Sequence, residues 1–411
     1  MDTTDRAPTA TATADPTSVP TAAPPSFSTE STTLARFHRA LYDLRTGTRK
    51  ESVRIYWLGD SHGQADFWSG ELRRLFANEF GGAGPGFVHL GYKNYRHDDV
   101  RLDIEGKWRM RPKKPVGIKK QADGVFGLGG LMMSGTEEDP RVDVRVSAKW
   151  KPSEIAFDLC YRRTAKQDAV VLQPMNGSDP IGSAIKLDGS PVGEIAHHTF
   201  TVGVTWPASA ELKHLNVLRV TPTLGVELCG LTMETAGKPG VVIDTLAING
   251  ARYGTMLAWD EAAWLREAER RRPDLVILEL GTNEAGDANP ATAKIEKQVG
   301  ELAARARKAN PDVDCIVISP TDRGDAPDRV EAVREATKRG AASAGCAFFD
   351  VWTLLGGKGA FAKLKEEQNP KVQPDGIHLT IRGYESIAGP TYDELLRGFD
   401  RSGWLGKVAS K

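Results

Sequence analysis

The feature that most constrains the fold of this chain is an alternation of short apolar strands with amphipathic helices, found in two separate stretches. Residues 33–99 read as helix, strand and helix, and residues 239–408 alternate between strands and helices. The strands "VRIYWL" and "LVILEL" carry apolar side chains at successive positions, as strands covered on both faces do. This alternation predicts an α/β fold with a parallel sheet and helices on both of its faces.

The stretch between these two parts, residues 100–238, has a different pattern. Segments such as "RVDVRVSAKW", "EIAFDLCYRR" and "LNVLRVTP" are short strands of rough period two, separated by Gly, Pro, Asp and Asn. That pattern is typical of a β-sandwich. We therefore predict one α/β domain in two parts, residues 33–99 and 239–408, interrupted by an inserted β-sandwich domain at residues 100–238.

The first 32 residues consist mostly of Thr, Ala, Pro and Ser, which cannot form a core, and they are expected to be a disordered tether. Such a tether commonly lies between an export signal and a folded domain. Either a signal has been trimmed from this chain or the protein is cytosolic; we expect the former, with the protein periplasmic, secreted or on the cell surface. A link to a membrane is expected only through such a signal or a lipid anchor.

The charge balance bears on the kinds of partner. The 54 basic and 54 acidic residues cancel, and no long basic stripe is present, so nucleic acid is not expected as a partner. No stretch approaches the roughly 20 apolar residues that a membrane-spanning helix needs.

The four cysteines leave the redox state partly open. Cys160 and Cys229 lie in one β-rich region, and whether they form a disulfide is left open. Cys315 and Cys346 lie in apolar, strand-like runs and are expected to be buried free thiols. None of the four has the spacing of metal ligands.

Four polar segments stand at strand ends or in loops of the predicted α/β domain. "GDSH" puts Ser61 on a sharp turn between a buried strand and a helix, where its hydroxyl is exposed and its N–H is free. "NGA" puts Gly250 in a turn, and "GTNE" puts Asn283 at the carboxyl end of a buried strand, where ligands bind in open parallel sheets. "DGIH" places Asp375 three residues before His378, so that the carboxylate can accept from Nδ1 and leave Nε2 free as a base. Each segment taken alone is also compatible with an ordinary turn, helix cap or surface histidine.

In their order along the chain, the four segments resemble the sequence blocks of the SGNH/GDSL hydrolase superfamily, which supply a serine, a glycine, an asparagine and a histidine. One position departs from the family pattern, because Glu284 follows Asn283 where an aspartate is usual. The asparagine itself is intact. The resemblance implies a flavodoxin-like, three-layer α/β/α fold around a parallel sheet.

The resemblance also implies a serine esterase mechanism that needs no metal and no organic cofactor. Ser61, His378 and Asp375 would form the catalytic triad, and acyl transfer would pass through a covalent serine ester. The N–H groups of Ser61 and Gly250, with the side-chain amide of Asn283, would form the oxyanion hole.

The region around Ser61, from "GDSHGQADFW" to "GPGFVHLG", resembles bacterial peptidoglycan O-acetylesterases and related carbohydrate esterases. In those proteins a β-rich, carbohydrate-module-like domain lies between the serine and glycine blocks. Here 188 residues separate Ser61 from Gly250, far more than one α/β connection requires. The resemblance implies removal of O-acetyl groups from an acetylated glycan, with peptidoglycan as the leading substrate. Aromatic side chains of the insert are candidate sugar platforms or core residues: Trp108, Trp150, Tyr161 and Trp206.

Other functions stay open at this point. A lipase or thioesterase with the same triad would need a long apolar acyl groove, and a glycan-binding protein or O-acetyltransferase is a further alternative. His62 either lines the site or caps the helix start. His197 and His198 are adjacent in a strand and would point to opposite faces, so they are not predicted to bind a metal together.

Overall fold

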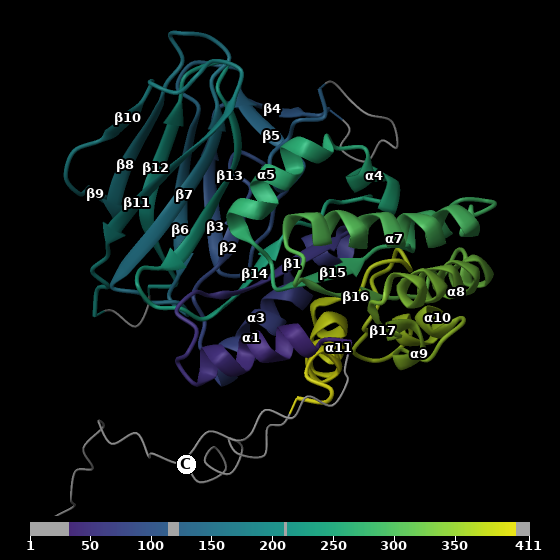
Figure 1. Ribbon diagram of the computed structural model, residues 1–411. Coiled ribbons are helices and arrows are strands. Elements are labelled where there is room, and N and C mark those ends of the chain that lie inside the picture. The colour runs from purple at the N-terminus through teal and green to yellow at the C-terminus, as the bar shows by residue number, and fades with distance from the viewer. Residues whose placement is uncertain (1–32, 114–122, 209–211, 400–411) are drawn as a thin grey trace, which may run out of the picture. The chain divides into compact units, whose positions relative to one another are not determined.

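A parallel sheet of five strands forms the centre of the α/β part in the computed structural model (Figure 1), which describes residues 33–113, 123–208 and 212–399. Its strands are β1 (Val53–Gly59), β14 (Val241–Thr245), β15 (Leu275–Glu279), β16 (Asp314–Ile318) and β17 (Ala347–Phe349). Their order in the sheet is β14-β1-β15-β16-β17. The strands that follow β1 along the chain are therefore added first on one side of it and then on the other, and ligands bind outside the carboxyl ends of the strands at such a point. The predicted N-terminal tether lies outside the described residues.

Helices cover both faces of the parallel sheet, as Figure 1 shows. Tyr56 and Leu58 of β1 belong to a core shared with α4 (Tyr253–Leu257), α5 (Glu261–Arg271), α7 (Thr292–Ala309) and α8 (Pro327–Ala344). Trp57 points to the other face, where its ring packs edge-on with Trp68; the two ring centroids are 5.2 Å apart. That face is covered by α1 (Ala35–Arg45), α3 (Phe67–Phe80) and α11 (Ile381–Leu395). The alternation read from the sequence is confirmed. The short helices are α2 (Ser61–Gln64), α6 (Thr282–Ala285), α9 (Val351–Leu354) and α10 (Ala360–Lys365).

Two antiparallel sheets occupy the middle of the chain. One has the order β10-β8-β12-β6-β3, with β9 paired to β8, and the other has the order β11-β7-β13-β5-β4, with β2 paired to β13. Side chains of both sheets, such as Val144 and Val220 from one and Leu159 and Leu231 from the other, form a single core cluster. The two sheets therefore pack face to face. Their strands are β2 (Gly86–Val88), β3 (Val100–Glu105), β4 (Trp108–Arg111), β5 (Met132–Gly135), β6 (Arg141–Ser147), β7 (Glu154–Arg162), β8 (Val170–Asn176), β9 (Asp179–Pro180), β10 (Ile185–Leu187), β11 (Ile195–Gly203), β12 (His214–Pro222) and β13 (Glu227–Thr235).

The antiparallel and parallel sheets belong to one compact unit, residues 29–398. Strand β2 lies before the predicted insert boundary at residue 100, yet it pairs with β13 of an antiparallel sheet. The division of the chain into an α/β domain and an inserted domain stays a prediction.

Both cysteine pairs form disulfides, and the expectation of free thiols at Cys315 and Cys346 is wrong. Cys315 lies on β16 and Cys346 directly precedes β17. These strands pair in parallel with Ile316 opposite Ala347, so the two cysteines face each other with their Cα atoms 4.8 Å apart. Cys160 and Cys229 are joined across β7 and β13, with Cα atoms 5.1 Å apart.

A polar contact joins the antiparallel sheet to helix α5. His197 of β11 lies between Asp158 of β7, 3.1 Å from Nδ1, and Glu267 of α5, 2.9 Å from Nε2. Because both ring nitrogens face carboxylates, both must donate, and the ring is an imidazolium. Burial lowers the pKa of His197, but the hydrogen bonds and charges of the two carboxylates raise it by more than burial lowers it. The resulting pKa is about 9.

The same contact contains a cluster of potential metal ligands in the described part of the chain, formed by Cys160, His197 and Glu267. The Cys160 sulfur is bonded to Cys229, and both nitrogens of His197 are engaged by carboxylates. In this oxidised state the cluster is an ion-paired contact between secondary-structure elements.

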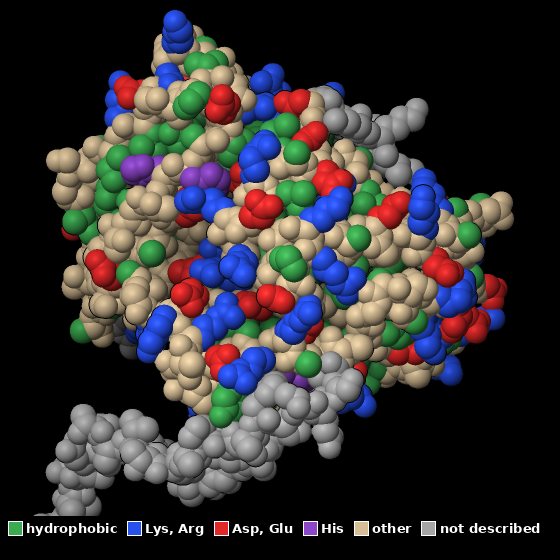
Figure 2. Space-filling view, in the orientation of Figure 1, with side chains coloured by type: hydrophobic (Ala, Val, Ile, Leu, Met, Phe, Trp, Pro, Cys, Tyr) green, Lys and Arg blue, Asp and Glu red, His purple; other side chains and the backbone are tan. Residues whose placement is uncertain are grey.

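The visible surface carries acidic and basic side chains side by side, without a large region of one sign (Figure 2). Among the described helices, none has the length and apolar composition required to span a bilayer.

Candidate active site

The candidate nucleophile lies on the strand–turn–helix unit that the sequence predicts. Strand β1 ends at Gly59, Asp60 occupies the cap position, and α2 begins at Ser61. The Asp60 carboxylate accepts a hydrogen bond from the His62 N–H at 3.0 Å and so caps the helix. Ser61 keeps part of its surface accessible, whereas its neighbours Asp60 and His62 are fully buried. The local structure therefore presents one hydroxyl at the carboxyl edge of the parallel sheet.

The structure brings together the three residues predicted to form the triad. His378 Nε2 lies 2.9 Å from Ser61 Oγ, and His378 Nδ1 lies 2.7 Å from an oxygen of Asp375. The other Asp375 oxygen accepts the backbone N–H groups of Ile377 at 2.9 Å and His378 at 3.0 Å. This geometry fixes the tautomer with the proton on Nδ1, so that Nε2 can accept the serine proton.

The charge on Asp375 follows from these contacts. Burial raises the pKa of Asp375, but the hydrogen bonds from His378 and Ile377 lower it by more than burial raises it. The resulting pKa is about 2. The carboxylate is therefore ionised at neutral pH and can stabilise an imidazolium at His378.

The loop that carries Asp375 and His378 is held by backbone hydrogen bonds. Gln373 donates its N–H to the His378 carbonyl at 2.8 Å, and Gly324 donates to the Gly376 carbonyl at 2.8 Å. Gly376 has φ +68°, a left-handed conformation that a glycine adopts without strain. The loop is thus tied to the segment after β16, which places His378 above the end of β1.

The predicted oxyanion residues come from the two neighbouring strands. Asn283 lies in α6, just after β15, and its Nδ2 donates to Asp60 Oδ2 at 3.3 Å and to the Ala251 carbonyl at 3.0 Å. Gly250 lies in the turn after β14 with φ +77°. The preceding residue, Asn249, donates its N–H to Gln64 Oε1 at 2.6 Å. The turn of Gly250 and the amide of Asn283 are therefore both hydrogen-bonded to the segment that carries Ser61.

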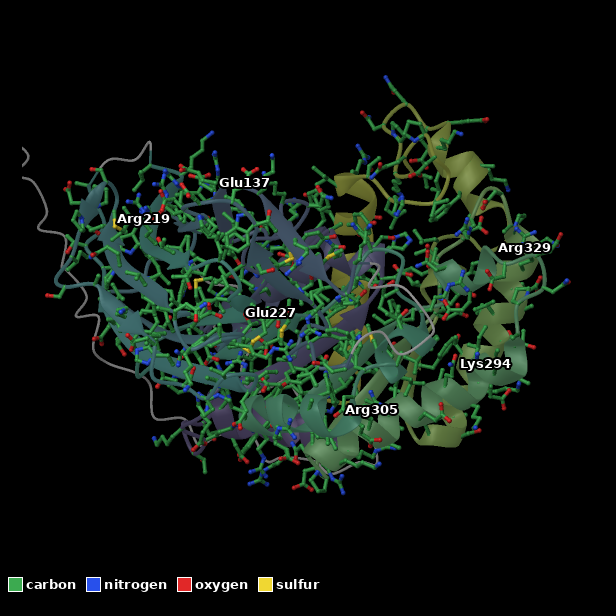
Figure 3. All side chains as sticks on the ribbon, turned by 90° about the horizontal axis from the view of Figure 1, so that it is seen from above. Glu137, Arg219, Glu227, Lys294, Arg305 and Arg329 are labelled. Atoms are coloured by element: carbon green, nitrogen blue, oxygen red, sulfur yellow. A yellow bond between two sulfur atoms is a disulfide. The ribbon has the colours of Figure 1, made fainter. Side chains whose placement is uncertain are left out.

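Helix α4, which follows the Gly250 turn, is fixed from two sides. Glu284 accepts the Tyr253 N–H at 2.9 Å, and burial raises the pKa of Glu284 to about 7. Arg305 of α7, labelled in Figure 3, donates to the carbonyls of Met256 at 2.8 Å and Leu257 at 3.3 Å. The glutamate that departs from the family pattern thus holds the start of this helix.

His62 lies beside the triad as a buried, neutral residue. Its Nδ1 lies 3.0 Å from the Tyr384 hydroxyl and its Nε2 lies 3.1 Å from Thr321 Oγ1. Burial, followed by the charge of His378, lowers the pKa of His62 to about 3. The ring centroids of His62 and His378 are 5.4 Å apart. Of the two roles predicted for His62, the position beside the site is correct. The other role is wrong, because Asp60 and not His62 caps the start of α2.

Sequence reasoning missed Glu279, Asp60 and Gln64 as residues of the site. Glu279 is 2% exposed at the end of β15, and Asp60 is 0% exposed at the end of β1. One signal was available, because the acidic Glu279 interrupts the otherwise apolar strand "LVILELG". The contacts of Asp60 and Gln64 depend on which strands are neighbours.

The aromatic candidates of the insert divide into two groups. Tyr161 is only 4% exposed and belongs to the core between the two antiparallel sheets, so it is not a sugar platform. Trp108, Trp150 and Trp206 are half-buried, and their indole N–H groups donate to Glu105 O, Thr235 Oγ1 and Pro152 O respectively. All three tryptophans pack in part against the core cluster between the two antiparallel sheets.

Comparison with known proteins agrees with this geometry. Residues 227–385 match the GDSL-like Lipase/Acylhydrolase family. A solved structure of a peptidoglycan O-acetylesterase aligns with a TM-score of 0.71 and 20% identity, covering 89% of this chain and 96% of that chain, which shows a shared fold. No curated protein matches the sequence.

Two other solved structures align more weakly. A carbohydrate esterase family 3 protein from Talaromyces cellulolyticus has a TM-score of 0.32 at 20% identity, covering 40% of this chain and 84% of its own. A family two carbohydrate esterase from Clostridium thermocellum, in complex with cellohexaose, has a TM-score of 0.30 at 10% identity, covering 72% of this chain and 99% of that chain.

The family match spans the strands that follow Ser61 in the sheet and includes Gly250, Asn283, Asp375 and His378, the same residues that the structure gathers around the serine. The chain is a carboxylic ester hydrolase whose residues 227–385 match the GDSL-like lipase/acylhydrolase family.

Proposed function

We propose that the protein is a serine O-acetylesterase that removes acetyl groups from a polysaccharide, with peptidoglycan as the leading substrate. The observation that carries the proposal is the continuous hydrogen-bond chain from Ser61 through His378 to Asp375, with Asn283 at the same edge of the sheet. The choice of substrate is supported by the likeness of this fold to a peptidoglycan O-acetylesterase.

In the proposed reaction, Ser61 Oγ attacks the ester carbonyl while His378 Nε2 takes its proton. Asp375 stabilises the resulting imidazolium, and the oxyanion accepts from the N–H groups of Ser61 and Gly250 and from Asn283 Nδ2, which exchanges its bond to the Ala251 carbonyl for the oxyanion. Each such donor typically lowers the barrier by about 2.7–4 kcal/mol. His378 then gives its proton to the leaving sugar oxygen as the C–O bond breaks, which frees the sugar hydroxyl, and a water molecule repeats the attack on the acyl-enzyme and releases acetate.

The proposed location is periplasmic, secreted or on the cell surface of a bacterium. Two disulfides support it, because such bonds persist in oxidising compartments and are rare in the cytosol. The half-buried tryptophans Trp108, Trp150 and Trp206 are compatible with a glycan substrate, because aromatic rings offer apolar faces to sugars.

The test is a substrate panel for the wild type and Ser61→Ala. The panel contains O-acetylated peptidoglycan, acetylated xylan and p-nitrophenyl esters from acetate to palmitate. We expect acetate release from a glycan and turnover that falls with acyl chain length, both abolished in Ser61→Ala. Faster turnover of palmitate than of acetate, without acetate release from either glycan, would replace the proposal with a lipase.

A further inference from the structure

A pair of buried carboxyl groups lies directly beneath the serine turn. Asp60 follows β1, and Glu279 is the last residue of β15, the neighbouring strand, where it pairs with Gly59. The two residues are 0% and 2% exposed. Neither belongs to the triad or to the oxyanion donors described above.

Glu279 binds the serine turn through one oxygen. Its Oε2 faces the Gly63 N–H at 3.0 Å, the Asp60 N–H at 3.3 Å and the Trp57 indole N–H at 3.4 Å. A side chain at position 59 could not coexist with this contact, because a Cβ on Gly59 would lie 2.5 Å from the same oxygen. The glycine before Asp60 therefore permits the close approach of the glutamate.

Asp60 connects the serine turn to Asn283. One oxygen accepts the His62 N–H at 3.0 Å, and the other accepts from Asn283 Nδ2 at 3.3 Å. An ionised carboxylate can accept at both oxygens, whereas an amide side chain offers one acceptor only. The charge and shape of Asp60 thus fix the plane of the Asn283 amide relative to Ser61.

The surroundings disfavour two negative charges. In the described ranges, no lysine or arginine forms an ion pair with Asp60 or Glu279. His378 is the ionisable group whose charge acts on Asp60, and the charges of the pair act in turn on Glu284, Tyr253 and Tyr384. Two adjacent carboxylates withdrawn from water cannot both ionise at low cost. Burial raises the pKa of Asp60 to about 6, and burial together with the charge of Asp60 raises the pKa of Glu279 well above its usual range.

We propose that Asp60 and Glu279 share one proton and are positioning residues for oxyanion binding. Protonated Glu279 holds the serine turn through its acceptor oxygen, and ionised Asp60 holds the Asn283 amide beside that turn. The inference rests on the proposed esterase function, because it assigns the pair to the oxyanion step.

The variants Glu279→Gln and Asp60→Asn separate the two roles. Glutamine is a neutral isostere of the protonated acid, so Glu279→Gln should lower kcat for p-nitrophenyl acetate much less than Asp60→Asn does. Asparagine has a single acceptor, so Asp60→Asn should lose the bond to His62 or to Asn283 and lower kcat by roughly 10–100-fold at unchanged KM, part of the effect of losing one oxyanion donor.

A double-mutant cycle distinguishes positioning from general loss of structure. Asp60→Asn combined with Asn283→Ala should be little slower than Asn283→Ala alone, because both changes remove the same contribution. Wild-type kcat in Asp60→Asn, or fully additive losses in the double variant, would overturn the positioning role.

The shared proton has a readout that does not depend on activity. The infrared difference spectrum between wild type and Glu279→Gln at neutral pH should contain the carbonyl band of a protonated carboxylic acid. Absence of that band, or a loss of kcat in Glu279→Gln as large as in Asp60→Asn, would overturn proton sharing. Full activity in Ser61→Ala would instead overturn the esterase mechanism, so the two failures are distinguishable.

Discussion

Replacement of His197 by glutamine should make the stability of the protein less sensitive to pH on the alkaline side. His197 joins strand β11 to helix α5, and its imidazolium bonds Asp158 and Glu267 at once. Its side chain is 19% exposed, so solvent screens these contacts only partly. Glutamine retains hydrogen-bonding capacity but cannot carry the positive charge.

The magnitude follows from the pKa. Folding raises the pKa of His197 from 6.5 to about 9, because the bonds to Asp158 and Glu267 outweigh burial. Since one pKa unit corresponds to ~1.36 kcal/mol, the charge contributes about 3 kcal/mol to the free energy of unfolding. A raised pKa means that this contribution is fully present below pH 6.5 and is lost as pH rises through about 9.

The assay is urea unfolding of wild type and His197→Gln across that pH range. The difference in their free energies of unfolding should shrink by about 3 kcal/mol as the pH rises from below 6.5 to above about 9. His198→Gln is the matched control, because it makes the same substitution at the adjacent position, where the ring stacks on Phe200. A difference between wild type and His197→Gln that stays constant with pH would refute the ion-pair reasoning.

Three further predictions concern the site, the antiparallel sheets and the disulfides. Asn283→Ala should lower kcat by roughly 10²–10³-fold with little change in KM in steady-state assays, and a pure KM effect would contradict an oxyanion role. Alanine at both Trp150 and Trp206 should slow hydrolysis of acetylated polymer while p-nitrophenyl acetate turnover stays within a few-fold of wild type, since a small ester has no remote part to bind; equal losses on both substrates would argue against glycan contacts. Replacing Cys315 and Cys346, which are 31 residues apart, by alanine should lower the free energy of unfolding by about 4 kcal/mol in urea titrations, and unchanged stability would contradict that disulfide.

Much of the α/β part could be predicted because its signals are local. The strand before Ser61, the helices at residues 292–309 and 327–344, and the strand ends that carry Asn283 and Gly250 follow from hydrophobic periodicity and turn residues. The order of the four polar segments along the chain then suggested that the strand ends and loops that carry them lie together.

What could not be predicted depends on which strands are neighbours and in what register. The Cys315–Cys346 bond requires β16 beside β17, and the contact of Glu279 with the serine turn requires β15 beside β1. Burial of Tyr161 likewise depends on how the antiparallel sheets pack. Periodicity in a single strand carries none of this information.

The central claim is that Ser61 forms a covalent ester with the acyl group of the substrate. The most direct measurement is mass spectrometry of the enzyme quenched with acid during turnover of p-nitrophenyl acetate, followed by peptide mapping. We predict one acetyl group on the peptide that contains Ser61, and none in Ser61→Ala. Steady turnover with no acetylated peptide, or with the acetyl group on another residue, would contradict the account.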